Sequence, residues 1–218
     1  MRTQFEEELV ALSSDITRLG NATNEAFHKA MKAFYERDKD LAEQLVADDL
    51  HINNLTIEIE QTAYRIIALQ QPVADDLRRV FAALISSNDF ERLADHAVLI
   101  AKAVIRQTDN NSDVEELDDI VRRMADPVGD MLSSVIEALA AVDVDQANQI
   151  AAKDAEVDAL LKKMYRESSK RMEYNTEVVP LGISYIGIAN NLERIGDYVS
   201  NICEQIIYMK TGAIVELN

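Results

Sequence analysis

The side chains best suited to do chemistry in this chain are two pairs of carboxylates, each spaced four residues apart. The segment Asn-Asp-Phe-Glu-Arg-Leu-Ala-Asp at 88–95, the first acidic motif, returns as Asn-Asn-Leu-Glu-Arg-Ile-Gly-Asp at 190–197, the second acidic motif. Residues four apart share one face of a helix, where two like charges destabilise the helix by roughly 0.2–0.5 kcal/mol. We therefore expect each pair to face a positive species. The pairs are Glu91 with Asp95 and Glu193 with Asp197.

A second set of oxygen-bearing side chains lies in the helices that we expect to precede the two motifs. These residues are Asp49, Asn53, Asp154 and Asp158. On a helical wheel they fall roughly 70–110° from the centre of the apolar face, so they can lean toward a neighbouring helix. Carboxylate and amide oxygens suit hard or borderline cations such as Mg²⁺, Mn²⁺, Ca²⁺ or iron. The eight residues together predict two metal sites, although an isolated carboxylate pair more often marks a solvated helix face.

Both acidic motifs have the same orientation relative to the apolar stripe of their helix. On the wheel of the last helix, Glu193 and Asp197 fall in an arc of about 80° directly opposite the apolar stripe. Glu91 and Asp95 take the same place on theirs. We therefore expect the two sites to be equivalent.

Apolar residues recur at helical spacing along nearly the whole chain, which predicts an all-α fold. Glycine and proline are scarce, with 6 and 3 residues, which disfavours sheet folds with many turns. Pro72 and Pro180 mark the starts of two helices. We expect six long antiparallel helices, near residues 4–36, 39–69, 73–107, 113–141, 144–173 and 178–210.

The chain repeats internally. Residues 38–42 match residues 143–147, and the acidic motifs follow in the same order in each half. Repeats of this kind predict a duplicated unit. We expect two tandem, pseudo-symmetric three-helix bundles, the first at residues 1–108 and the second at 109–218. The polar segment 108–113 is the natural boundary between them.

Composition narrows the function classes. The chain has 218 residues with 22 basic and 39 acidic side chains, a net charge of −17, which speaks against binding nucleic acid or inserting into an anionic membrane. No apolar run reaches the length of a membrane span. Cys203 is the only cysteine, so no disulfide can form within the chain, and we expect it to be a packed thiol in a reducing compartment, the cytoplasm.

Catalytic machinery is not visible, and we expect no enzyme activity, no catalytic residues and no organic cofactor. The chain lacks a Walker A loop, a dinucleotide-binding glycine pattern and a Gly-x-Ser-x-Gly elbow. Glu25 and His28 have the Glu-x-x-His spacing of di-iron carboxylate proteins, but the second copy has Ser133 in place of the histidine. One copy of that spacing does not make a di-iron site.

Two residues within the acidic motifs and two that directly follow them have roles that the sequence leaves open. His96 follows the first motif and is expected on its rim, while its counterpart is Tyr198. Arg92 and Arg194 either neutralise neighbouring carboxylates or meet an anion or a partner.

Two tandem three-helix units that each close with Glu-Arg-apolar-x-Asp resemble the PhoU family of phosphate-system regulators. Residues 70–79 look like the family's approach to its third helix, and residues 91–102 and 193–204 look like its two signature segments. The resemblance covers essentially the whole chain. It implies a cytoplasmic protein, often a homodimer, with multinuclear metal clusters on the motif carboxylates and iron as one candidate metal.

The resemblance also implies a function. Members restrain phosphate uptake and phosphate-starvation signalling by contacting the phosphate ABC transporter and a membrane sensor histidine kinase at the inner face of the membrane. The order of His96 and Tyr198 is the reverse of the more usual one, and Cys203 stands where alanine is common, which leaves the metal and the equivalence of the sites open. A helical-bundle metal-dependent enzyme and a metal-free acidic adaptor remain the alternatives.

Overall fold

The protein is all-helical in the computed structural model, which describes residues 2–107 and 115–217. The helices are α1 Arg2–Glu36, α2 Lys39–Gln70, α3 Ala74–Arg106, α4 Glu115–Ala141, α5 Val144–Ala151, α6 Asp154–Tyr174, the short 3₁₀ helix η1 Thr176–Val178, and α7 Val179–Thr211. The described residues contain no strand. The expected all-α fold of two tandem helical bundles is confirmed.

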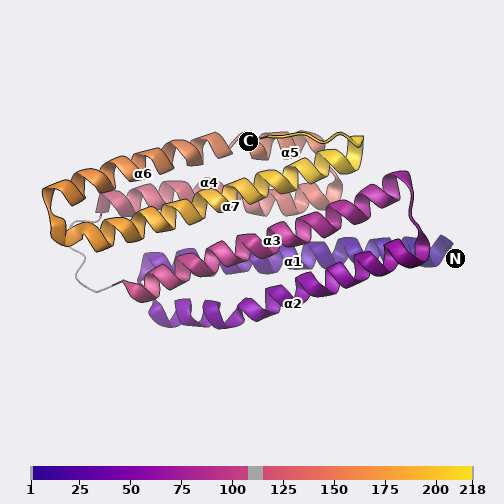
Figure 1. Ribbon diagram of the computed structural model, residues 1–218, viewed down its shortest axis with the longest axis horizontal. Coiled ribbons are helices and arrows are strands. Elements are labelled where there is room, and N and C mark those ends of the chain that lie inside the picture. The colour runs from indigo at the N-terminus through magenta and orange to yellow at the C-terminus, as the bar shows by residue number, and fades with distance from the viewer. Residues whose placement is uncertain (1, 108–114, 218) are drawn as a thin grey trace.

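The helices form two halves that lie along the long axis of the molecule (Figure 1). Helices α1, α2 and α3 pack together in one half, and α4 to α7 pack together in the other. The most extensive contact of all joins the halves, between α3 and α7, and α1 also packs on α4. The two helices that carry the acidic motifs are therefore the central helices of the fold.

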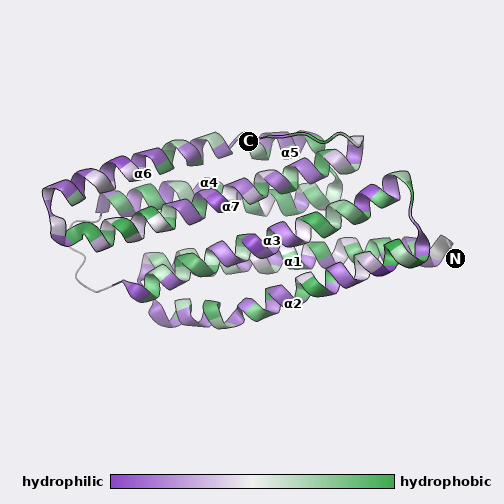
Figure 2. Ribbon diagram, viewed as in Figure 1, coloured by the Kyte–Doolittle hydropathy of each residue, from purple (hydrophilic) through white to green (hydrophobic). Residues whose placement is uncertain are grey.

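Apolar side chains of both halves form one continuous core. Figure 2 shows hydrophobic stretches along the central helices, whereas α6 is mostly hydrophilic. None of the described helices combines the length and the apolar character that crossing a bilayer requires.

The sequence repeat at residues 38–42 and 143–147 is also a structural repeat. Asp38 and Asp143 cap α2 and α5, and their carboxylates accept a hydrogen bond from the backbone N–H three residues later, at 2.9 and 3.0 Å. The preceding residues, Arg37 and Val142, both have a left-handed backbone conformation, with φ of 55° and 53°. This conformation ends the preceding helix and lets the backbone N–H of each aspartate bond back into that helix, at 3.0 Å.

The expected fifth helix, at 144–173, was wrong as a single element. It is divided into α5 and α6 by a turn at Ala152 and Lys153. The backbone N–H of Lys153 bonds to the carbonyl of Ile150, three residues earlier instead of four, at 3.0 Å. That tighter turn redirects the chain, so that α6 begins at Asp154 beside α7.

The other expected helices agree with the structure within two residues at the ends that it describes. Pro180 lies in the first turn of α7, and Asp75 and Asp76 lie in the first turn of α3. Pro72 precedes α3 instead of lying in its first turn. The expected boundary between the halves, residues 108–113, lies outside the described residues.

A polar cluster around Arg37 joins the two halves at one end of the molecule. Its guanidinium donates to both oxygens of Asp118 at 2.6 and 2.8 Å, to the hydroxyl of Tyr185 at 2.9 Å and to the side chain of Gln107 at 3.0 Å. The buried Tyr185 donates in turn to Asp118 at 2.5 Å. The cluster therefore ties the ends of α1 and α3 to α4 and α7.

We predict that Tyr185→Phe lowers the free energy of unfolding by about 1–2 kcal/mol. The ring keeps its packing, but Asp118 loses a donor in a half-buried position. Urea unfolding followed by circular dichroism measures the difference. Tyr174→Phe is the matched control, because the Tyr174 side chain is 95% exposed. Equal stability of the two variants would show that the hydroxyl contributes nothing to the contact between the halves.

Candidate metal centres

The structure brings together the residues of the expected first site. Asp49 and Asn53 lie on α2, which packs along α3, the helix that carries Glu91 and Asp95. The Asn53 amide donates to Asp49 at 3.4 Å. Burial raises the pKa of Asp49, and the nearby Asp95 carboxylate raises it further. Burial likewise raises the pKa of Glu91, with added repulsion from Asp95 and Asp49.

The second site has the same arrangement on α6 and α7. Asp154 and Asp158 lie on α6, beside Glu193 and Asp197 of α7. Burial raises the pKa of Asp154 to about 6, with repulsion from Asp197, Asp158 and Glu193 adding to the effect. Burial and then Asp197 raise the pKa of Glu193. The outer helix of each half thus contributes two polar residues to the motif of its central helix, as the wheel predicted.

Gly196, inside the second motif, makes room for Asp154. A Cβ atom at Gly196 would lie 2.7 Å from Oδ1 of Asp154. The first motif has Ala94 at this position. Asp154 is accordingly buried, whereas its counterpart Asp49 is half-buried. The two sites are therefore similar but not identical.

The two motif arginines have different partners. Arg194 lies over its own motif, with Nη1 3.3 Å from Asp197 and Nε 3.8 Å from Glu193. Arg92 instead reaches across to α7, where Nη1 donates to the hydroxyl of Tyr198 at 3.3 Å and the guanidinium lies 5.8 Å from the ring centroid. Arg194 thus neutralises carboxylates of its own motif, one of the two open interpretations, while Arg92 contacts a tyrosine of the other half, which neither interpretation anticipated.

His96 and Tyr198, the residues after the two motifs, meet across the contact between α3 and α7. Their ring centroids are 5.7 Å apart. His96 Nδ1 also lies 2.8 Å from the side-chain oxygen of Asn191 on α7. His96 is therefore engaged in the contact between the halves. Cys203 is fully buried, as expected, and burial raises the pKa of its thiol to about 12.

Sequence reasoning missed Asp89, which lies within the first acidic motif. Asp89 is only 8% exposed, and burial raises its pKa to about 7, with Glu204 adding repulsion and Arg92 opposing the shift. One of its oxygens has no hydrogen-bond partner. One signal in the sequence could have drawn attention to Asp89: the matching position of the second motif has a neutral amide, Asn191, in place of a carboxylate.

The side chains at both sites fit a hard divalent cation by their chemistry. Among the described residues of the two sites, three buried oxygens have no hydrogen-bond partner: Oδ1 of Asp49, Oδ1 of Asn53 and Oδ1 of Asp154. A buried acceptor without a partner costs about 1–3 kcal/mol, which a bound cation would offset. Within the described part of the chain, no three His, Cys, Asp or Glu side chains already form a group able to hold a metal ion. Binding therefore requires side-chain rotation, for which the exposed Asp95 is free, and release of Arg194 at the second site.

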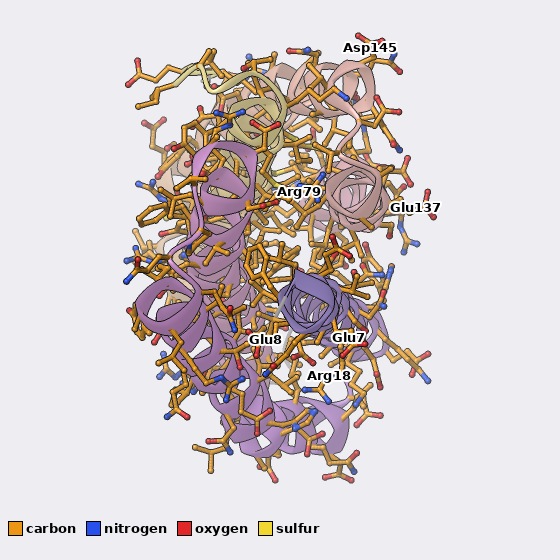
Figure 3. All side chains as sticks on the ribbon, turned by 90° about the vertical axis from the view of Figure 1, so that its right-hand side faces the viewer. Glu7, Glu8, Arg18, Arg79, Glu137 and Asp145 are labelled. Carbon is orange, nitrogen blue, oxygen red and sulfur yellow. The ribbon has the colours of Figure 1, made fainter. Side chains whose placement is uncertain are left out.

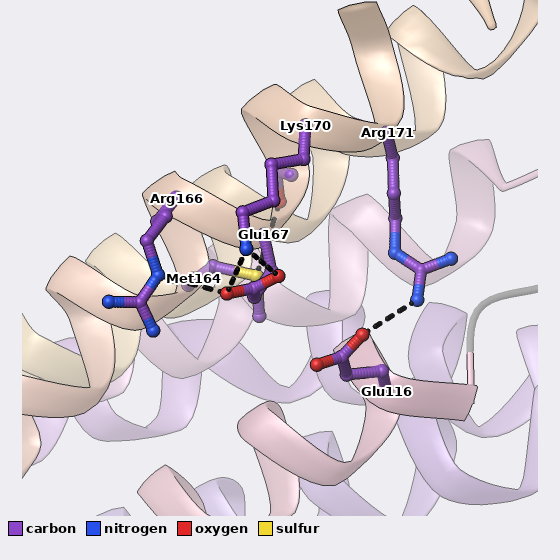
Figure 4. A network of polar contacts seen from close by, with 7 residues as sticks. Glu116, Met164, Arg166, Glu167, Lys170 and Arg171 are labelled. Atoms are coloured by element: carbon purple, nitrogen blue, oxygen red, sulfur yellow. Dashed lines mark hydrogen bonds and ion pairs between the residues drawn. The ribbon is translucent and has the colours of Figure 1, made fainter. Parts of the chain in front are cut away.

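Near its C-terminal end, α6, the outer helix of the second site, has one ion pair with α4 and others within itself (Figure 4). Arg171 donates to Glu116 at the start of α4, at 3.0 Å. Glu167 accepts from Arg166 at 2.9 Å and from Lys170 at 3.1 and 3.2 Å on α6 itself. The cross-helix pair supports the packing that keeps Asp154 beside α7.

Comparison with known proteins identifies relatives over the full chain. A family model described as the PhoU domain matches residues 16–104 and 121–206, and each match contains one acidic motif. The Streptococcus pneumoniae protein named phosphate-specific transport system accessory protein PhoU homolog is 35% identical and aligns over 100% of both chains. The Zymomonas mobilis protein of the same name is 38% identical over 95% of this chain and 87% of its own length.

Solved structures give the same result. The phosphate transport system regulatory protein PhoU from Streptococcus pneumoniae superposes with a TM-score of 0.91 at 33% identity, over 97% of this chain and 99% of that one. PhoU from Pseudomonas aeruginosa superposes with a TM-score of 0.91 at 30% identity, over 96% of this chain and 100% of that one.

We predict that Gly196→Ala and Gly187→Ala affect stability differently, although both lie inside α7. Replacing a helical glycine by alanine stabilises a helix by roughly 0.5–1 kcal/mol where space allows. A Cβ at Gly187 meets nothing within 4 Å, so this variant should gain that amount. At Gly196 the Cβ displaces the Asp154 carboxylate, so the gain should be lost. Urea unfolding compares the two, and equal gains would mean that the contact with Asp154 is unimportant.

We predict that Asp154 makes the metal-free protein less stable as pH rises from about 4 to about 6. Its folded-state pKa, about 6, lies above the ordinary aspartate value, so the native state holds the proton more tightly than the unfolded chain. The stabilising contribution is complete at the acid end of this window and is lost as pH passes the folded-state pKa.

The free energy of unfolding of Asp154→Asn should therefore exceed that of the wild type by roughly 1–2 kcal/mol at pH 7 and by little at pH 4. Urea unfolding in the presence of a chelator measures this difference across the pH range. A difference that does not change with pH would contradict the prediction.

Proposed function

Because this chain belongs to the PhoU family, we propose that it is a non-enzymatic regulator of phosphate uptake. Relatives that align along its full length are named accessory or regulatory proteins of the phosphate transport system. The observation that carries the proposal is this full-length match to phosphate-system proteins. The structure adds the duplicated candidate site. Each half combines a Glu-x-x-x-Asp pair on its central helix with an Asp-x-x-x-Asn or Asp-x-x-x-Asp pair on its outer helix.

The proposed role is negative regulation. When phosphate is plentiful, the protein restrains uptake and starvation signalling by contacting the phosphate ABC transporter and its membrane sensor histidine kinase from the cytoplasm. The net charge of −17 supports contact with basic surfaces of such partners and opposes direct association with anionic lipid. We also propose that the protein acts as a homodimer.

We further propose that each acidic motif binds metal, with iron or another hard or borderline divalent cation as the candidate. Glu91 and Asp95 would hold it with Asp49 and Asn53 at the first site. Glu193 and Asp197 would hold it with Asp154 and Asp158 at the second site. A bound cation supplies positive charge that offsets the carboxylate repulsion. By binding the same cation from two helices, these residues would hold the outer helix of each half against its central helix.

The geometry around Glu25 and His28 supports the proposal that the protein is not a helical-bundle enzyme. Glu25 forms an ion pair with Lys29 at 3.1 Å. The exposed His28 ring packs edge-on against Phe27, with centroids 5.6 Å apart. Ser133, at the matching position of the second half, donates to Asn24 at 3.4 Å. These contacts leave Glu25 and His28 in surface interactions.

We predict that a Glu91→Ala/Glu193→Ala double variant loses metal and regulation together. Removing one carboxylate from each site takes away a ligand and a negative charge, which weakens the binding of a divalent cation. Elemental analysis of protein purified under metal-replete conditions measures the metal, and Glu43→Ala/Glu173→Ala, at exposed positions away from both sites, is the control. A wild type as metal-poor as the double variant would favour the metal-free adaptor.

In cells that lack the gene, we expect faster uptake of labelled phosphate and active starvation signalling in phosphate-rich medium. The wild-type gene and the control variant should restore repression, and the double variant should not. Unchanged uptake and signalling after deletion would contradict the regulatory proposal, whatever the metal content of the protein.

A further inference from the structure

A cleft opens between the two halves at the end of the molecule where α1 begins and α4 ends. Its volume is about 790 Å³. It is bounded by the first half of α1, the start of α3, the end of α4 and the last turns of α7. The lining is mainly aliphatic, and includes Leu9, Leu12, Ile16, Leu139 and Met209. None of these residues belongs to either candidate metal site.

The shape of the cleft fits a helix. The α1 wall runs from Phe5 to Thr17, a length of about 18 Å at the rise of an α-helix. Leu9, Leu12 and Ile16 occupy one face of α1 along that length. Val10 lies at the edge of the cleft and is 70% exposed. An open apolar groove between helices is the form in which proteins bind the apolar face of an amphipathic helix.

The surroundings of the cleft are acidic. Of the described residues that line it, Arg79 is the only cation, and Glu6 and Asp76 are anions. Figure 3 looks onto this end of the molecule, with Arg79 between α1 and α4. Figure 3 also labels the cation Arg18 and further carboxylates at this end of the molecule, which lie on α1, α4 and α5: Glu7, Glu8, Glu137 and Asp145.

We infer that this cleft binds an amphipathic helix of a partner protein, with lysine and arginine residues flanking the apolar face. The apolar face of that helix lies on the aliphatic lining, and its cations meet the surrounding carboxylates. A second copy of this chain is a poorer fit. Its most hydrophilic helix, α6, is rich in cations, but the apolar residues that α6 would place in the cleft are already buried in its own core: Val157, Leu160 and Met164. The inference does not depend on metal or on phosphate regulation.

The test uses the full-length protein and a fluorescein-labelled 18-residue peptide with leucine on one helical face and lysine on the other. Fluorescence anisotropy at physiological salt measures binding. Val10→Arg places a cation at the edge of the cleft, where it repels the peptide and interrupts the apolar lining. Leu50→Arg is the matched control, because Leu50 is equally exposed, at 72%, on α2 outside the cleft.

The wild type should bind the lysine peptide, and Val10→Arg should weaken binding about tenfold, because it puts a cation where the peptide's own cations lie. Leu50→Arg should bind like the wild type, and a peptide with glutamate in place of lysine should not bind. Asp76→Lys, a second variant among the lining residues, should also weaken binding, and circular dichroism checks that each variant is folded.

Three results would overturn the inference. The first is no binding of the lysine peptide, and the second is equal weakening by Val10→Arg and Leu50→Arg, which would indicate non-specific attraction to an acidic protein. The third is self-association of the wild type that Val10→Arg abolishes, measured by analytical ultracentrifugation, because it would assign the cleft to a second copy.

Discussion

Repulsion among carboxylates that are partly removed from water is the interaction on which the two sites depend. Burial is the largest cause of the raised pKa of Asp154, and repulsion from three nearby carboxylates raises it further, to about 6. Charges in such a position destabilise the folded state unless a proton or a cation compensates them. The remainder of the fold must therefore supply enough packing energy to hold α6 against α7 and α2 against α3. The continuous core that both halves share provides that packing.

The contact between α3 and α7 places the two sites on helices that pack against each other. Both acidic motifs lie on these central helices, and the residues that follow the motifs, His96 and Tyr198, meet across the contact. Arg92 donates a hydrogen bond to Tyr198 of the other half, whereas Arg194 forms ion pairs with Glu193 and Asp197 of its own motif. The second site therefore has an arginine paired directly with both of its motif carboxylates, whereas at the first site the charges of Arg92 and Lys102 oppose the rise in the pKa values of Glu91 and Asp49. A duplicated sequence has produced two sites with the same ligand types and different local charge.

Much of the fold follows from local sequence patterns, because helical periodicity and end signals act over a few residues. The caps at Asp38 and Asp143 and the start of α7 at Pro180 are of this kind. The turn at Ala152 was not predictable in the same way, since the apolar pattern continues through it and neither glycine nor proline marks it. It depends on the packing of α6 on α7, which brings Asp154 to Gly196.

The candidate sites were predictable as sets of residues on helix faces, but their partners were not. The partner of an arginine can lie on a helix about 100 residues away, as the hydrogen bond between Arg92 and Tyr198, with a separation of 106, illustrates. The burial of Asp89 depends on the same long-range contact. Wheel geometry gives the direction of a side chain, and tertiary packing decides what it touches.

Anomalous X-ray diffraction from crystals grown with Mn²⁺ or Fe²⁺ tests most directly whether the acidic motifs bind metal. Data collected on both sides of the metal's absorption edge locate the ions independently of the protein coordinates. We expect peaks between α2 and α3 and between α6 and α7, each within about 2.0–2.6 Å of motif carboxylate oxygens. Crystals that contain the metal but show no peak at either motif, or peaks only elsewhere on the surface, would contradict the assignment.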